Sequence, residues 1–433
     1  MIVKLIWPAQ EHDRPVDAFW VECTAREVTE VLLPRLSADQ RSELASLQQR
    51  KQAGEVNTHF LIARDLSTIQ PMPAIYPYAS LWNAYNPFRT IPDLFVATLE
   101  AINTIAVDHE AEPTPGPQYP PDGAESFTSK MRFHQSWYRA HVLKRHYGLG
   151  PGMHSQKPYG NMLKRDAGEQ GANFLTDDIA RLAKQYLKQH SGLIERFRLL
   201  NNMLSSQPMC FNLFGPLVGD LPRATRLLSA LMPGEIARVT EVRIEYAPQP
   251  KARYLNDNTA FDAFVRYERM DGTRAFLGIE TKLTEPFSQK RYDGEHYRSW
   301  TERADSPWPA SSWDKLADIL HNQLWRDHLL AVALRHDPNE SYSAGRLMLV
   351  RHPEDEGCRT VAENYRSLLN PTDDTFIDMR IDRLVDAWQP LLIDDAERTW
   401  LDAFHQRYLN LAASEAAWDA QAPQTKRRTK RAK

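Results

Sequence analysis

The stretch "FDAFVRYERMDGTRAFLGIETKLTEPF", residues 261–287, decides the fold, because it reads as two mostly apolar strands joined by a short turn. The strands are expected at 261–268 and 273–283, on either side of an Asp-Gly pair typical of hairpin turns. Charged side chains are rarely buried without a partner. Three of them nevertheless lie inside these apolar runs: Asp262, Glu280 and Lys282.

The length of the turn predicts which residues face each other. We expect a three-residue loop, 270–272, in which Gly272 takes the left-handed conformation and forms a bulge. Counting back along both strands then places Asp262 opposite Glu280. Because side chains alternate along a strand, Lys282 points to the same side as Glu280.

This pairing has a chemical consequence. Two facing carboxylates have β-carbons about 5 Å apart and repel each other in a half-buried sheet. A hard divalent cation such as Mg²⁺, for which Mn²⁺ could substitute, suits such oxygens and keeps water molecules that can become nucleophiles. Lys282 could orient or deprotonate that water, or stabilise charge on a phosphoryl group. The pattern indicates phosphodiester hydrolysis, although spacing alone leaves salt-bridged strand ends as the alternative.

The segments around the hairpin predict an α/β core. "RATRLLSALMP" reads as a short helix and "RVTEVRIEY" alternates as a strand. Farther on, "GRLMLVRH" reads as a strand buried on both faces. The order helix, three strands, helix, strand predicts a mixed sheet with a crossover helix, and residues 360–412 read as helices that cover one flank. The crossover helix "WDKLADILHNQLWRDHLLAVALRH" carries an apolar stripe made by Leu316, Leu320, Leu324 and Leu330.

A proline-rich stretch, "HEAEPTPGPQYPPDG", separates the ends of the chain, because five prolines and two glycines in fifteen residues preclude regular structure. We therefore divide the chain into an N-terminal accessory domain at 1–108, a Pro-rich linker at 109–125, a helical region at 126–221, the α/β core at 222–352, C-terminal helices at 353–412 and a flexible basic tail at 413–433.

Composition bounds the cellular setting. No segment approaches the roughly 18 apolar residues of a membrane span, and three cysteines are too few for a disulfide framework. We therefore expect a cytoplasmic protein without membrane partners. The net charge is −3, but "KRRTKRAK" at 426–433 supplies six positive charges, which leaves the body near −9. Such a tail could hold polyanions or merely aid solubility.

A long connection, 284–310, interleaves basic and aromatic residues in a way that suits nucleic acid, because cations bind phosphates and rings stack on bases. Loops of this length are more often functional than idle. Packing of the aromatic residues onto the body is the alternative. The candidate binding residues are Lys290, Arg291, Tyr292 and Arg298.

These features resemble the PD-(D/E)xK nuclease superfamily, whose core has the same element order, with an acid on the second strand and acid-x-Lys on the third. "NMLSSQPMCFNLFGPL", "AFDAFVRY", "GIETKLTEPF" and "NQLWRDHLLAVAL" are similar to a bacterial family of predicted restriction endonucleases, over about residues 126–351. The resemblance implies a catalytic triplet of Asp262, Glu280 and Lys282, with both acids as metal ligands. It also implies Glu245 as an extra carboxylate ligand and Gln323 as a polar residue near the site. Phe261 replaces the expected proline.

The resemblance further implies a metal-dependent nuclease that leaves a 5′-phosphate and acts in bacterial defence. Defence against foreign DNA favours DNA over RNA as substrate. The N-terminal domain could then sense or dock a protein partner, and a homo-oligomer stays open. The rival interpretation is a nucleic-acid-binding or scaffold protein with a vestigial nuclease site.

Overall fold

The computed structural model describes residues 113–118, 126–151, 157–189 and 194–421, together with the backbone of five short strands nearer the N-terminus. The chain folds as two compact units, Met1–Glu112 and Pro113–Lys433. The described strands of the first unit form two antiparallel sheets, one of order β1-β2-β4 and one that pairs β3 with β5. Their bounds are β1 Ile2–Ile6, β2 Ala18–Glu22, β3 Leu61–Ala63, β4 Ala74–Tyr78 and β5 Phe95–Ala97.

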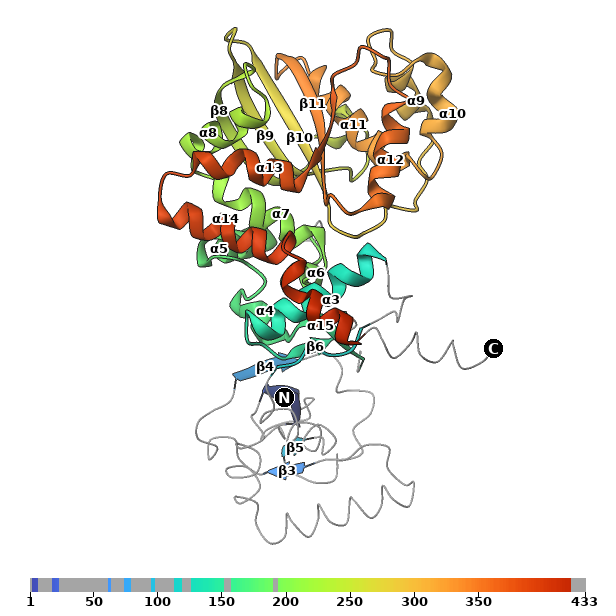
Figure 1. Cartoon of the computed structure of the whole chain (residues 1–433). Coiled ribbons are helices and arrows are strands. Elements are labelled where there is room, and N and C mark those ends of the chain that lie inside the picture. The colour runs from blue at the N-terminus through green and yellow to red at the C-terminus, as the bar shows by residue number, and fades with distance from the viewer. Residues whose placement is uncertain are drawn as a thin grey trace, which may run out of the picture. The chain divides into compact units, whose positions relative to one another are not determined.

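The second unit is built on a mixed five-stranded sheet of order β12-β11-β10-β9-β8, which Figure 1 shows between two layers of helices. β8, β9 and β10 are antiparallel neighbours, whereas β11 runs parallel to β10 and β12 parallel to β11. This confirms the expected α/β class and its mixed sheet. The strands are β8 Ile236–Tyr246, β9 Phe261–Arg269, β10 Arg274–Lys282, β11 Tyr342–Arg351 and β12 Phe376–Arg380.

The strand β12 corrects the expectation that 360–412 holds only helices. Its five residues, "FIDMR", are too few to show a clear period, and they become a strand by pairing with the edge of β11. The segments on either side of it are helical as expected. They are α12 Glu356–Arg366, α13 Ile381–Trp388 and α14 Asp395–Tyr408.

One face of the sheet packs against α11 (Asn322–Arg335) and α12, beside α9 (Glu295–Thr301) and α10 (Trp313–Leu316). The prediction of one continuous crossover helix is wrong, because the chain turns between α10 and α11. The Asp318 carbonyl accepts the amides of His321 and Asn322, and its side chain accepts that of Leu320. Leu320, predicted in the apolar stripe, is consequently 45% exposed.

The opposite face packs against α7 (Ser206–Phe214), α8 (Leu221–Leu231) and α13, with α14 behind them. The alternation predicted for β10 is confirmed by the two cores. Leu277 and Ile279 belong to the core on this face, whereas Phe276 belongs to the core beneath α11. Glu280 and Lys282, in phase with Phe276, therefore lie on the α11 side.

The helical region before the sheet consists mainly of α3 (Phe127–His141), the β6–β7 pair and three further helices. Part of the predicted linker lies against it, because buried Arg139 donates to the carbonyls of Thr114 and Pro115 at 2.6 and 3.2 Å. The remaining bounds are β6 Tyr147–Leu149, β7 Pro158–Leu163, α4 Arg165–Gln170, α5 Asp177–Gln189 and α6 Arg196–Asn201.

The stretch predicted as a flexible tail begins with a helix, α15 (Ala412–Gln421), which packs on α3 through rings of Trp418 and Phe133 whose centroids lie 5.3 Å apart. The basic run 426–433 lies outside the described residues. Within the described part of the chain, no helix is long and apolar enough to cross a membrane.

Candidate active site

The β9–β10 hairpin has the predicted register. Its loop holds three residues, Gly272 has a φ of +79°, and the Arg269 amide donates to the Thr273 carbonyl at 2.8 Å. The paired residues run back to Ala263 and Ile279. One step farther, the same register sets Asp262 beside Glu280.

A third acid joins them from β8. Ile244 pairs with Ala263 and Tyr246 pairs with Phe261, so the residue between them, Glu245, lies beside Asp262. Three neighbouring strands thus place Glu245, Asp262 and Glu280 in one row, which we call the acid row. Glu245 has a φ of +51°, and such left-handed strain at a non-glycine residue occurs preferentially at functional sites.

Asp262 is held by the neighbouring strand. Its Oδ2 accepts hydrogen bonds from the Thr281 amide at 2.8 Å and from the Thr281 hydroxyl at 2.6 Å. These bonds fix the carboxylate at the point where the β9–β10 ladder ends. Both of these hydrogen bonds are made through Oδ2.

Glu280 and Lys282, each only 6% exposed, form a triangle with Gln323 at the start of α11. Lys282 Nζ lies 3.1 Å from Glu280 Oε1, and Gln323 Nε2 donates to the same oxygen at 2.8 Å. Gln323 Oε1 in turn accepts from Lys282 Nζ at 3.2 Å and from the Ser288 amide at 2.7 Å. The predicted residues Glu280, Lys282 and Gln323 are therefore brought together.

If all three acids were ionised, the acid row would carry more negative charge than its surroundings compensate. Burial is the main cause that raises the pKa of all three acids. Repulsion from Asp262 adds to it at Glu245, whose pKa is raised to about 8, and at Glu280, whose pKa is raised well above its usual value. Burial opposes the charge of Lys282, but the Glu280 and Asp262 carboxylates outweigh it and raise its pKa above the usual value. Lys282 is consequently a charged ammonium at neutral pH.

The acid row fits a hard divalent cation in its chemistry, because it offers carboxylate oxygens whose mutual repulsion a cation would relieve. Within the described residues, however, no three His, Cys, Asp or Glu side chains are arranged as a ready ligand set. One oxygen of Glu280 is engaged by Lys282 and Gln323. A bound cation would therefore need Glu280 to offer its other oxygen or to turn.

Sequence reasoning missed two residues beside the site. Gln207 of α7 donates to Glu245 Oε1 at 3.0 Å. It lies within the quoted motif "NMLSSQPMCFNLFGPL", but nothing in that motif indicates a contact with Glu245, because α7 reaches the site only through tertiary packing. Asp327 is buried one helical turn beyond Gln323, and its Oδ2 lacks a hydrogen-bond partner within the described residues. Burial raises its pKa to about 7. The four-residue spacing from Gln323 is the signal that could have found Asp327.

The predicted nucleic-acid-binding residues differ in their surroundings. Lys290 and Arg291 are exposed, and Arg291 lies 3.4 Å from Asp293. Tyr292 is half-buried against the guanidinium of Arg326, 4.0 Å from the ring centre, so it packs onto the body. Arg298 pairs with Glu302 at 2.8 Å. Lys290 and Arg291 are consequently the better placed of the four to meet a ligand.

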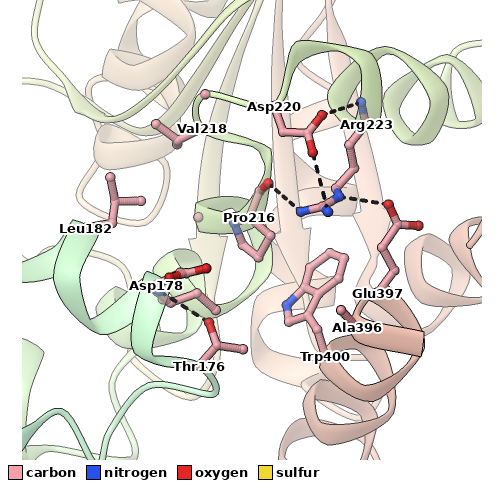
Figure 2. A pocket seen from close by; sticks show the side chains of 13 residues that line it. Thr176, Asp178, Leu182, Pro216, Val218, Asp220, Arg223, Ala396, Glu397 and Trp400 are labelled. Atoms are coloured by element: carbon pink, nitrogen blue, oxygen red, sulfur yellow. Dashed lines mark hydrogen bonds and ion pairs between the residues drawn. The ribbon is translucent and has the colours of Figure 1, made fainter. Parts of the chain in front are cut away.

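A cavity of about 530 Å³ lies elsewhere, between α5, α8 and α14 (Figure 2). Glu397, one of three acids that line it, is almost fully buried but accepts hydrogen bonds from Arg223 at 2.9 Å and from Arg226. Burial would raise the pKa of Glu397, yet the Ile393 amide and both arginines lower it. The charge of Glu397 is therefore compensated by two arginines, unlike the charges of the acid row.

The comparison with known families agrees with this geometry. A family model described as the PD-(D/E)XK nuclease superfamily matches residues 122–410, which includes the whole five-stranded sheet and the helices α12 to α14. Among curated proteins and among solved structures, none matches the chain significantly.

Proposed function

The chain belongs to the PD-(D/E)XK nuclease superfamily, and from that premise we propose that it hydrolyses nucleic-acid phosphodiesters at the site formed by Asp262, Glu280 and Lys282. The observation that carries this proposal is the uncompensated acid row beside a charged lysine. Like charges are brought together at a cost, and they persist at sites where a cationic ligand or a reaction needs them.

Asp262 and Glu280 are the proposed ligands of a divalent metal, Mg²⁺ or Mn²⁺, with Glu245 as a third carboxylate. Such a metal, when bound, lowers the pKa of a water molecule to the range in which it becomes a nucleophile. Lys282 is charged at neutral pH, so it stabilises negative charge on the phosphoryl oxygens rather than removing a proton. Gln323 holds Lys282 and Glu280 in their relative orientation.

DNA as the preferred substrate, endonucleolytic cleavage and a role in bacterial defence against foreign DNA are finer parts of the same proposal. They rest on the resemblance of the quoted motifs to restriction endonucleases. The exposed Lys290 and Arg291, close in sequence to the end of β10, suit the approach of a polyanion of either kind.

The test is a cleavage assay with the purified full-length chain. Supercoiled plasmid, single-stranded DNA and RNA are incubated with Mg²⁺, Mn²⁺ or EDTA, and products are resolved by electrophoresis. We expect metal-dependent cleavage that Glu280→Ala lowers by about 10³-fold. The matched control is Glu268→Ala on the same hairpin, because Glu268 pairs with Arg238 at the surface and should be dispensable.

Two outcomes would contradict the nuclease. Wild type and Glu280→Ala could leave every substrate intact with every metal while both bind nucleic acid, which would favour the binding or scaffold protein with a vestigial site. Alternatively, Glu280→Ala could cut at the same rate as Glu268→Ala, which would place the chemistry elsewhere.

A further inference from the structure

Arg198 approaches the acid row from outside the sheet. It lies on α6, and its guanidinium is held at two points. Nε donates to the Ser205 hydroxyl at 2.7 Å, and Nη2 donates to Glu285 Oε1 at 2.8 Å. A guanidinium fixed in this way has lost its rotational freedom before any ligand arrives.

Glu285 ties this arginine to the reactive strand. It follows Lys282 by three residues, just beyond the end of β10. Its Oε1 also accepts from the Ser206 amide at 2.7 Å and from the Ser206 hydroxyl at 3.2 Å, so the carboxylate is fixed at the start of α7. The position of Arg198 is thereby linked to the strand that carries Glu280 and Lys282.

Arg198 interacts electrostatically with the acid row and is partly exposed to solvent. Burial opposes its charge, but Glu285 and then Asp262 and Glu245 raise its pKa. The side chain is 45% exposed, and Nη1 makes no hydrogen bond within the described residues. Nε and Nη2 of the guanidinium are therefore committed to Ser205 and Glu285, while Nη1 is left for a ligand.

A nucleic-acid backbone that approaches the acid row is repelled by carboxylates and needs fixed positive charge beside them. Guanidinium groups suit phosphates, because their planar donors can contact two oxygens at once. We propose that Arg198 is a phosphate-binding residue of this site and contacts a backbone phosphate that flanks the bond to be cut. This inference rests on the proposed nuclease function and names the phosphate contact that the function requires.

Binding without cleavage tests the contact directly. In a Glu280→Ala background, the dissociation constant of a short labelled DNA duplex, or of RNA if the cleavage assay selects it, is measured across salt concentrations. We expect Arg198→Ala to weaken binding about tenfold and to reduce the salt slope by about one. The matched control is Arg196→Ala, because Arg196 lies on the same helix and pairs with Glu169 at the surface, 2.5 Å away.

Steady-state kinetics distinguish a residue that contacts phosphate from one that only holds the structure together. In the chain with Glu280 intact, Arg198→Ala should raise KM about tenfold and change kcat much less, since a flanking phosphate is bound equally in ground and transition states. Arg198→Lys keeps the charge but loses the forked contact, so it should keep the salt slope and bind several-fold more weakly. If thermal unfolding shows that Arg198→Ala is not folded, Arg198→Lys tests the phosphate contact in its place.

The outcomes are distinguishable. If the chain cuts nucleic acid but the Arg198 variants bind as tightly as Arg196→Ala, this inference is overturned and the nuclease stands. A loss of thermal stability with an unchanged dissociation constant would likewise overturn it, because Arg198 would then have only a structural role, linking α6 to Glu285. If wild type neither binds nor cuts any nucleic acid, the proposed function and this inference both fail.

Discussion

The two ends of the β9–β10 hairpin carry similar numbers of charges and treat them differently. At the turn, each acid has a basic partner: Glu268 lies 2.7 Å from Arg238, Asp271 lies 3.2 Å from Arg269, and Glu235 pairs with Arg346. At the open end, Lys282 and the more distant Arg198 face the whole acid row. The hairpin can evidently compensate its charges, so the imbalance at the open end belongs to what the site does.

The first prediction removes the cation in the acid row. Lys282→Ala should lower the cleavage rate by about 10²- to 10³-fold, because the charge that stabilises the phosphoryl oxygens is lost. It should also lower the free energy of unfolding at pH 8, since carboxylates buried beside Lys282 lose their counter-charge. Single-turnover cleavage and urea unfolding measure the two effects.

The control for this change is Arg238→Ala at the turn end, where an exposed ion pair contributes at most about 1 kcal/mol. If Lys282→Ala cuts as fast as Arg238→Ala, the two ends of the hairpin do not differ in chemistry, and the acid row is not the reaction site.

The second prediction removes an acid at the turn end of the hairpin, where the charges are compensated. Glu235 accepts from the buried Tyr267 hydroxyl at 2.7 Å and pairs with Arg346. Glu235→Ala therefore leaves the Tyr267 hydroxyl without its acceptor and leaves Arg346 with Asp374 as its remaining acidic partner. We expect the free energy of unfolding to fall by about 2 kcal/mol. Cleavage at saturating substrate should stay unchanged, because the acid row lies at the other end of β9. A parallel loss of cleavage in folded protein would show that the ends are coupled.

Much of the hairpin could be predicted because it is set by local chemistry. The Asp271 carboxylate accepts the Thr273 amide at 2.9 Å, and the glycine between them adopts the left-handed conformation that fixes a three-residue loop. The register follows by counting, and it brings Asp262 beside Glu280. The alternation of β10 then assigns Lys282 to the same face.

The rest depends on contacts between distant segments, which no local pattern records. α7 packs on β8, β9 and β10 and brings Gln207 to Glu245, whereas α6 packs on α7 and brings Arg198 to Glu285. Gln207 lies in a quoted motif, but that motif does not indicate this contact, and Arg198 belongs to no quoted motif. The edge strand β12 forms only because β11 offers it a partner. The break before α11 arises from Asp318, whose capping bonds compete with an apolar stripe that favours a continuous helix.

The third prediction concerns Asp327, the acid that α11 adds near the open end. Arg326, Lys282, Asp262 and Asp257 are the charges that act on it. Its pKa is raised from 3.8 to about 7, so the folded chain holds a proton that the unfolded chain releases. Stability from this group is present below about pH 4 and is lost as pH rises towards 7.

Asp327→Asn removes that titration. Relative to wild type, the variant should gain roughly 4 kcal/mol of unfolding free energy between pH 4 and pH 8, because each unit of pKa shift corresponds to about 1.4 kcal/mol. Parallel urea titrations at both pH values would measure this gain. Asp271→Asn at the turn is the matched control, because its carboxylate is exposed and should show no such gain. An equal pH dependence in wild type and Asp327→Asn would mean that Asp327 is ionised in the folded chain and has a partner there.

The last prediction is the smallest and tests whether the turn sets the register without contributing to the chemistry. Gly272 has a φ of +79°, and a β-carbon added there would meet no atom within 4 Å. Gly272→Ala should therefore cost only the backbone strain, about 1 kcal/mol of unfolding free energy, and Gly272→Asn should cost less, since asparagine tolerates this conformation. Urea unfolding orders the two variants. Cleavage should be equal in both, because the pairs between the turn and Ala263 hold the register once it is formed. A drop in cleavage with Gly272→Ala alone would mean that the geometry of the acid row depends on the conformation of the turn even after the strands have paired.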